Sequence, residues 1–238
     1  MEERYSRQTA YLGKDAQEKL KMSKVCIIGC GGLGSCSAEL LARAGVGTIK
    51  LVDKDIVELS NLQRQHLYTE EDLGIPKVVA LGRHLKKINS EIRVMPIWKN
   101  IGADNASGII YDCDLVLDGL DNMESRFALN RACVETKKPW IYASVIRSSG
   151  FVSFVKPGAN CLECFIRKIP KTGDNAALGI INPTPTIAAS LQVNEAIGFL
   201  TTGKSGLASK LLHFNLRANE FKIFKTKKCG KCAACGRK

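Results

Sequence analysis

A glycine-rich turn near the start of the chain has the spacing needed to hold a nucleotide. Gly29-Cys30-Gly31-Gly32-Leu33-Gly34 matches the pattern G-x-G-x-x-G and follows the apolar run 24–28. A strand, a tight glycine turn and a helix together direct backbone N–H groups and a positive helix end at phosphate. Asp53 ends the next apolar run, where an acid would hold a ribose hydroxyl. This pattern predicts nucleotide binding, and it is commonest in dinucleotide-binding dehydrogenases.

The polar segment after Asp53 could bind more phosphate than a dinucleotide contains. Asn61 and Gln63 offer hydrogen bonds, and Arg64 offers a planar fork suited to phosphate oxygens. Lys77 follows Pro76 in the first turn of a predicted helix, where the helix dipole disfavours a cation unless an anion is bound there. Lys77 is therefore predicted to contact phosphate.

Two carboxylates follow the buried strand predicted at residues 113–118. Because ligands bind at the carboxyl ends of parallel strands, Asp118 and Asp121 are expected to project towards the crevice beside the glycine turn. Turn and helix-capping chemistry is the alternative interpretation for these residues and for Asn122. Carboxylates beside a polyphosphate would repel it without a divalent cation, and Mg²⁺ is the natural choice.

Five of the ten cysteines are grouped, and their spacing favours a metal. The groups are Cys161-x-x-Cys164 and Cys229-x-x-Cys232-x-x-Cys235, whereas the other five cysteines stand singly in apolar segments, as buried thiols do. Paired C-x-x-C knuckles in an intracellular α/β protein favour a metal over a disulfide. Four thiolates on one Zn²⁺ would carry a charge of about −2, which lysines in the tail would offset.

Composition and charge limit the class of protein. The 238 residues are 45% hydrophobic and 24% charged, which is ordinary for a globular protein with a sizeable core. No apolar run has the roughly 18–20 residues of a membrane span, and the first residues lack a signal sequence, so a cytoplasmic location is expected. The net charge of +12 (35 Lys and Arg less 23 Asp and Glu) permits three interpretations: a solvated surface around the zinc knuckle, an acidic protein partner or RNA.

The elements that must position these residues alternate as in an α/β protein. Strands are predicted at 24–28, 48–52, 91–98, 113–118, 140–145 and 150–155, with helices at 15–22, 35–44, 77 onwards, 122–137 and 184–201 and a hairpin at 210–225. We expect a Rossmann-like fold whose mostly parallel sheet is extended by antiparallel strands, plus a zinc knuckle of four cysteines. Residues 1–238 are expected to form one domain, with 1–23 as an N-terminal arm and 161–164 and 229–235 as the knuckle.

Taken together, these motifs resemble the MoeB/ThiF family of adenylyltransferases, relatives of the ubiquitin-activating enzymes. The resemblance extends from Arg4-Tyr5-Ser6-Arg7-Gln8 to the last cysteines. It includes the glycine turn, Asp53, Ser60-Asn61-Leu62-Gln63-Arg64-Gln65, Lys77, Asp121-Asn122 and the C-x-x-C pairs. These motifs occur in the order and spacing of the family.

The resemblance implies an ATP site in a homodimer. The residues expected to bind ATP are Gly31, Gly32, Asp53, Ser60, Asn61, Leu62, Gln63, Arg64, Lys77, Asp121 and Asn122. Arg7, Arg64, Lys77 and Asp121 are implied to be catalytic, with Asp121 also near Mg²⁺ and Arg7 reaching the other subunit's site. Cys161, Cys164, Cys229 and Cys232 match the zinc ligands, and the additional Cys235 could compete with Cys232.

The implied reaction is adenylation of a ubiquitin-like sulfur-carrier protein that ends in Gly-Gly. Its terminal carboxylate, with a pKa of about 3.5, is already ionised and needs no general base. Family members that bond covalently to the carrier have a cysteine at positions corresponding to 172–178, and residues 171–178 contain none here. The residues leave open two alternative functions: an NAD(P) oxidoreductase, and a relative that activates a carboxylate on modified tRNA. They also leave open which pathway is served: molybdopterin, thiamine or tRNA thiolation.

Overall fold

A computed structural model describes residues 3–166 and 179–236 of the chain. The segment 171–178, whose lack of cysteine bears on a covalent step, lies outside these described residues. None of the described helices is long and apolar enough to cross a membrane.

Eight strands in the described residues form one sheet in the order β3-β2-β1-β4-β5-β6-β7-β8. The first five in that order are parallel: β3 (Arg93–Trp98), β2 (Thr48–Asp53), β1 (Lys24–Ile28), β4 (Leu115–Asp118) and β5 (Trp140–Ile146). The antiparallel strands β6 (Ser149–Val155), β7 (Lys210–Asn215) and β8 (Glu220–Lys225) extend it. The predicted Rossmann-like sheet with an antiparallel extension is confirmed.

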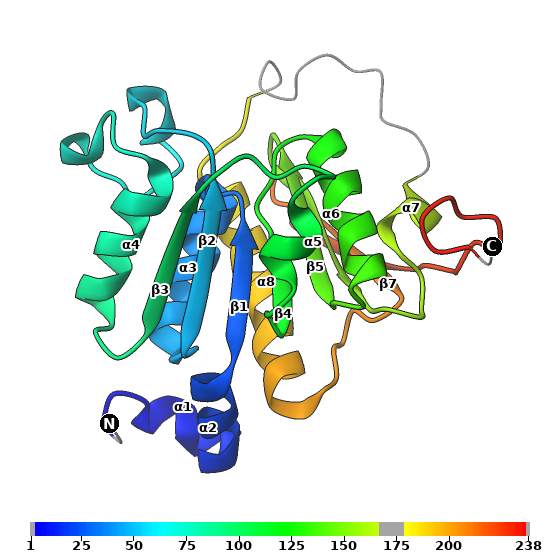
Figure 1. Cartoon of the computed structure of the whole chain (residues 1–238), viewed down its shortest axis with the longest axis horizontal. Helices are drawn as coiled ribbons and strands as arrows, with labels where there is room; N and C mark the ends of the chain where they lie inside the picture. Colours follow the sequence, from blue (N-terminus) through cyan, green and yellow to red (C-terminus); the bar gives the residue numbers. More distant parts are fainter. Residues whose placement is uncertain (1–2, 167–178, 237–238) are drawn as a thin grey trace.

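Helices cover both faces of the sheet and give three layers (Figure 1). One face packs on α3 (Gly32–Ala44), α4 (Lys77–Ile88) and α8 (Pro183–Thr202), and the other on α5 (Ala106–Ile110), α6 (Met123–Glu135) and α7 (Leu162–Phe165). Strand β1 shows why: Val25 and Ile27 belong to the first core, and Cys26 and Ile28 to the second. Successive side chains of a strand point to opposite faces, so a strand buried on both faces is apolar throughout.

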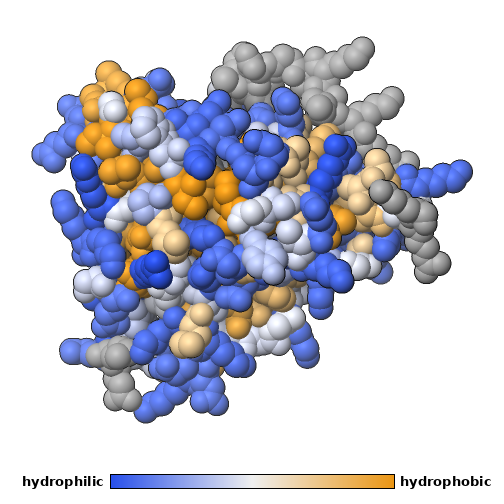
Figure 2. Space-filling model, in the orientation of Figure 1, coloured by the Kyte–Doolittle hydropathy of each residue, from blue (hydrophilic) through white to orange (hydrophobic). Residues whose placement is uncertain are grey.

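The N-terminal helices α1 (Ser6–Leu12) and α2 (Lys14–Met22) lie below the amino ends of the strands in Figure 1. Figure 2 shows that this lower end is mostly hydrophilic, whereas apolar residues gather higher on the same view, towards the carboxyl ends of the strands. The short helices α1, α5 and α7 were not predicted from sequence, because a helix of one or two turns has too few residues to display a periodic pattern.

Candidate functional site

The glycine turn lies where the order of the sheet reverses, between β1 and β4. A Cβ at Gly29 would lie 2.5 Å from the carbonyl oxygen of Gly119, and a Cβ at Gly34 would overlap the carbonyl oxygen of Gly29. Gly29 also has a φ of 92°, a conformation that side chains disfavour. These glycines let the turns after β1 and β4 touch, and they expose the N-terminus of α3 at the carboxyl edge of the sheet. Crevices at this edge are where such sheets bind ligands.

Asp53 holds the glycine turn in place. Its Oδ2 accepts a hydrogen bond from the Cys30 N–H at 2.6 Å, and its Oδ1 accepts one from the Asp55 N–H at 2.8 Å. Burial raises the pKa of the Asp53 carboxyl, while these N–H donors and the Lys77 cation act in the opposite direction. Each carboxylate oxygen can accept more than one hydrogen bond, so a ribose hydroxyl remains compatible with this arrangement.

Lys77 brings a buried cation to the same turn. It is the first residue of α4, its side chain is 8% exposed, and its Nζ lies 3.2 Å from Asp55 Oδ2. The Tyr68 hydroxyl donates to the carbonyl oxygen of Cys30 at 2.8 Å and lies 3.4 Å from that of Lys77, so it joins the glycine turn to the start of α4. The structure therefore places the Lys77 charge beside the glycine turn.

The polar segment after β2 packs on the glycine turn. It contains the short helix η1 (Leu59–Asn61), and a Cβ at Gly32 would lie 2.8 Å from the carbonyl oxygen of Arg64. Asn61 is buried, and its Oδ1 accepts from the Glu58 N–H at 3.2 Å. The Arg64 guanidinium donates to the Ser60 carbonyl at 3.1 Å. Among the other expected ATP-binding residues, Ser60 and Gln63 are exposed and Leu62 is half-buried.

Asp118 does not face the crevice, contrary to the prediction. It is fully buried, its Oδ2 accepts from Arg126 Nε at 2.9 Å, and its Oδ1 accepts from the Leu120 N–H at 2.8 Å. Burial raises the pKa of the Asp118 carboxyl, against the effect of the Arg126 cation. Arg126 also donates to the carbonyl oxygens of Leu120 and Ala143. This buried pair is structural and fixes the turn that precedes Asp121.

Asp121 and Asn122 lie exposed at the end of that turn. Asn122 caps α6, because its Oδ1 accepts from the Ser125 N–H at 2.9 Å, in agreement with the helix-capping interpretation. The Asp121 carboxylate accepts from the Asn122 amide at 3.2 Å. Asp121 is therefore accessible to a ligand, and its carboxylate fits a contact to Mg²⁺.

Arg7 lies away from this edge of its own chain. It is exposed on α1, at the opposite end of the sheet from the glycine turn (Figure 1). The structure therefore does not bring Arg7 together with the other predicted site residues of the same chain.

Four cysteine sulfurs converge at a second site, next to α6. The Sγ atoms of Cys161, Cys164, Cys232 and Cys235 all lie within 4.8 Å of one another. Neighbouring sulfurs are 3.4 to 3.9 Å apart. Four ligands at about 2.3 Å from a tetrahedral zinc ion would be about 3.8 Å apart. The donor set and its spacing therefore fit Zn²⁺.

The four converging sulfurs differ in one member from the zinc ligands expected from sequence. Cys235, not Cys229, completes the cluster. Cys229 contributes its backbone instead: its N–H lies 3.4 Å from Cys164 Sγ, which places a donor on that sulfur. Gly236 permits the closing turn, because a Cβ there would clash with the carbonyl oxygen of Cys232.

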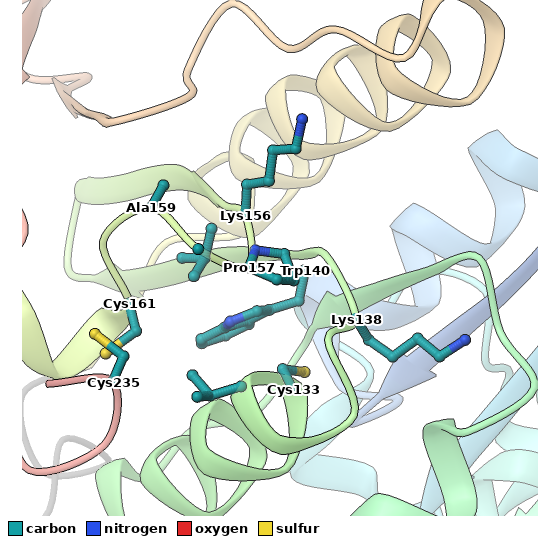
Figure 3. A pocket seen from close by; sticks show the side chains of 11 residues that line it. Cys133, Lys138, Trp140, Lys156, Pro157, Ala159, Cys161 and Cys235 are labelled. Atoms are coloured by element: carbon teal, nitrogen blue, oxygen red, sulfur yellow. The ribbon is translucent and has the colours of Figure 1, made fainter. Parts of the chain in front are cut away.

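Side chains from α6 hold the first cysteine pair in place. Asn130 Oδ1 accepts from the Leu162 N–H at 2.9 Å, and Arg131 binds both carboxylate oxygens of Glu163 at 3.0 and 3.2 Å. Behind the sulfurs lies a cavity of about 30 Å³, lined by Cys133, Trp140, Cys161 and Cys235 among others (Figure 3). This cavity has room for about one water molecule.

Two residues that bear on the sites were missed by sequence reasoning. Gln65 was not among the expected ATP-binding residues, yet it is buried with its side chain against Gly31. Asn61, Gln65 and Tyr68 have spacings of four and three, which could have indicated that they turn inward together. Nothing in the sequence marked Arg126 as important, because its partner Asp118 was expected to face the crevice and not to form a buried ion pair.

Comparison with known proteins agrees with this geometry. The ThiF family model matches residues 5–234. The chain is 39% identical to the sulfur carrier protein ThiS adenylyltransferase of Bacillus subtilis, over 99% of this chain and 72% of that protein. It is 35% identical to the molybdopterin-synthase adenylyltransferase of Escherichia coli, over 98% of this chain and 96% of that protein.

A longer relative and a solved structure extend the comparison. The chain is 36% identical to the adenylyltransferase and sulfurtransferase MOCS3 of Xenopus laevis, and the match spans 53% of that protein. A crystal structure of E. coli MccB with ATP superposes with a TM-score of 0.87 at 28% identity, covering 98% of this chain and 75% of that chain. The family match and these relatives agree with the Rossmann-like sheet and its glycine turn: the chain belongs to the ThiF family.

Proposed function

We propose that this protein adenylates the C-terminal glycine carboxylate of a ubiquitin-like sulfur-carrier protein, using ATP and releasing pyrophosphate. Membership of the ThiF family supports the proposal, as do the relatives named as adenylyltransferases of ThiS and of molybdopterin synthase. The carrier would end in Gly-Gly, as the resemblance implied.

The observation that carries this proposal is the buried Lys77 cation beside the glycine turn. Lys77 and the N-terminus of α3 bring positive charge to one edge of the sheet, with Arg64 in the segment that packs on the same turn. A dinucleotide needs only the helix end and Asp53, whereas a triphosphate carries more charge and calls for additional cations. The arrangement therefore favours ATP over NAD.

The chemistry requires positioning and charge rather than a general base. The ionised carboxylate of the carrier attacks the α-phosphorus of ATP, a new P–O bond forms, and the bond to pyrophosphate breaks. Lys77 and Arg64 would neutralise charge on the phosphates, Asp53 would hold the ribose, and the glycine turn would donate backbone N–H groups. Mg²⁺, held through Asp121, would screen the phosphates from the carboxylates.

Arg7 would complete the site of a second subunit. Its place on α1, at the far end of its own sheet, supports a role in trans rather than in its own subunit's site. The protein would then be a homodimer with shared sites. Zn²⁺ bound by Cys161, Cys164, Cys232 and Cys235 would be structural, because all four coordination positions are taken by the chain.

Pyrophosphate exchange tests the proposal directly. The purified protein, ATP, Mg²⁺ and radiolabelled pyrophosphate are incubated with carriers of the ThiS and MoaD types, each with its Gly-Gly end intact or deleted. Label should enter ATP only with an intact carrier. Absence of exchange with every carrier would refute the proposal, and tight NADH binding without ATP binding would favour an oxidoreductase.

A further inference from the structure

Gln65 is a buried glutamine whose side-chain oxygen has no hydrogen-bond partner in the described part of the chain. The residue is 2% exposed, and its Oε1 is enclosed and unpaired among the described residues. Gln17, also buried, is satisfied at both ends: its Nε2 donates to the Ala44 carbonyl at 3.0 Å and its Oε1 accepts from Gln8 at 2.6 Å. Leaving a buried amide oxygen unpaired costs stability, so the position of Gln65 calls for an explanation.

The other end of the Gln65 carboxamide borders the glycine turn. Its Nε2 lies 3.7 Å from where a Cβ of Gly31 would be, and no other described atom lies within 4 Å of that point, apart from the chain neighbours of Gly31. Gly31 is the N-cap of α3, a helix of 13 residues. The space beside Gly31 is therefore open to a ligand, with the positive helix end on one side and Gln65 on the other.

Ser35 adds a second unsatisfied polar atom at the same helix end. It is fully buried near the start of α3, and its Oγ has no partner within the described residues. Exposed Gln63, which sequence reasoning had expected to bind ATP, has no comparable position. Two buried side chains with an unpaired polar atom, Gln65 and Ser35, thus lie near the helix end that the proposed function assigns to phosphate, and both of those atoms are enclosed.

We propose that Gln65 binds the nucleotide, its Nε2 donating a hydrogen bond to a phosphate oxygen that lies against Gly31. This inference rests on the proposed function and adds a residue to it. A carboxamide is a neutral donor fixed by its burial, so it would orient one phosphate oxygen while the nearby cations supply the charge. The phosphate oxygen would pair with Nε2, which borders Gly31 at the N-terminus of α3, and Oε1 would stay enclosed and unpaired.

The variant Gln65→Leu separates binding from folding, because leucine keeps the approximate volume and removes both amide atoms. We expect its dissociation constant for ATP, measured by calorimetry without carrier, to rise about tenfold. Adenosine, which has no phosphate, should bind the variant and the wild type equally. The melting temperature should not fall, since the lost oxygen had no partner.

Two further variants keep the test decisive. Gln17→Leu removes a satisfied buried carboxamide and should lower the melting temperature, as a matched control for stability. Gln65→Glu keeps the shape and places a carboxylate beside the phosphate, so it should weaken ATP binding at least as much as Gln65→Leu, and it also serves if the leucine variant fails to fold.

The outcomes distinguish the inference from the function on which it rests. If the wild type binds no ATP, the proposed function fails and the inference fails with it. If the wild type binds ATP and both Gln65 variants bind it equally well, only the inference is overturned. An equal loss of ATP and adenosine affinity would also overturn it, because the contact would then not be to phosphate.

Discussion

At the scale of single residues, two buried lysines differ in the number of groups that hold them. Lys50 is 8% exposed and is held by the protein itself, through Asp112 and the Ile109 carbonyl oxygen. Lys77 is equally buried, and its carboxylate partner is as exposed as Asp112, but the ammonium of Lys77 has only that one contact, to Asp55 at 3.2 Å, among the side-chain hydrogen bonds of the described residues. A buried charged side chain with few hydrogen-bond partners is typical of a binding site, whereas a buried charged side chain with several partners is typical of a structural role.

Lys77→Met should weaken ATP binding without unfolding the protein. The methionine keeps most of the aliphatic stem, and Asp55 can turn to water when the ammonium is lost. We expect the dissociation constant for ATP to rise by about 10- to 100-fold, the effect of removing a charge-assisted hydrogen bond. Calorimetric titration with ATP measures this change, and an unchanged affinity would contradict the placement of Lys77 on phosphate.

Asp112→Asn should destabilise the protein in a pH-dependent way. Hydrogen bonds from Lys24 and Lys50 hold the pKa of the Asp112 carboxyl well below its usual range. Because the folded pKa lies below the unfolded value of about 3.9, the stabilisation is complete above about pH 5 and is lost as the pH falls towards the folded pKa. Since Asp112 is half exposed, we expect a cost of about 1 kcal/mol at neutral pH.

Urea denaturation of the wild type and Asp112→Asn at pH 7 and pH 3 checks this expectation. The difference in free energy of unfolding should shrink at the lower pH. Glu220→Gln, which breaks the exposed pair between Glu220 and Lys222, is the control and should show no measurable difference at either pH. A difference for Asp112→Asn that does not change with pH would argue against the ion pairs.

At the scale of elements, the glycines of the turn between β1 and α3 differ in what surrounds them. Gly34 and Gly29 are needed because backbones touch, whereas Gly31 faces open space beside Gln65. Glycine is therefore needed at different positions of this six-residue motif for different physical reasons. The sequence pattern alone does not distinguish them.

A matched pair of alanine variants tests this division. Gly34→Ala forces a methyl group into the Gly29 carbonyl oxygen and should cost about 3 kcal/mol of stability or more. Gly31→Ala should fold with near wild-type stability but lose ATP affinity, because its methyl occupies the proposed phosphate position. Thermal unfolding and ATP titration of both variants measure the two effects, and a reversed order of stabilities would refute the assignment.

At the scale of the whole molecule, the cysteine cluster ties the end of the chain back to α7 and α6. We expect one zinc ion per chain by elemental analysis. Cys235→Ser should lose the metal and lower the melting temperature, while Cys229→Ser should retain both. Zinc loss in Cys229→Ser with retention in Cys235→Ser would restore the ligand set expected from sequence.

Sharing of sites between subunits can be tested by mixing two variants. Arg7→Ala and Asp121→Ala should each be inactive in pyrophosphate exchange. If Arg7 acts in trans, a heterodimer of the two contains one intact site, and random reassociation should restore about a quarter of the wild-type sites. Failure to recover activity after verified subunit exchange would exclude a shared site.

The sequence by itself determined the sheet and indicated the kinds of ligand that are proposed above. Apolar runs such as 24–28, the glycine spacing, Lys77 at the start of a helix and the C-x-x-C groups depend on local patterns, which a sequence displays directly. The strand and helix expectations matched the structure to within a few residues, and the position of Lys77 at the first residue of α4 is confirmed.

Only the tertiary structure decided which of several similar residues face the sites. Asp118 is buried against Arg126, Gln65 rather than Gln63 lies against the glycine turn, and Cys235 rather than Cys229 completes the sulfur cluster. In each case the sequence offered residues of the same type a few positions apart. The choice depends on contacts between segments distant along the chain, and a local pattern contains no record of those contacts.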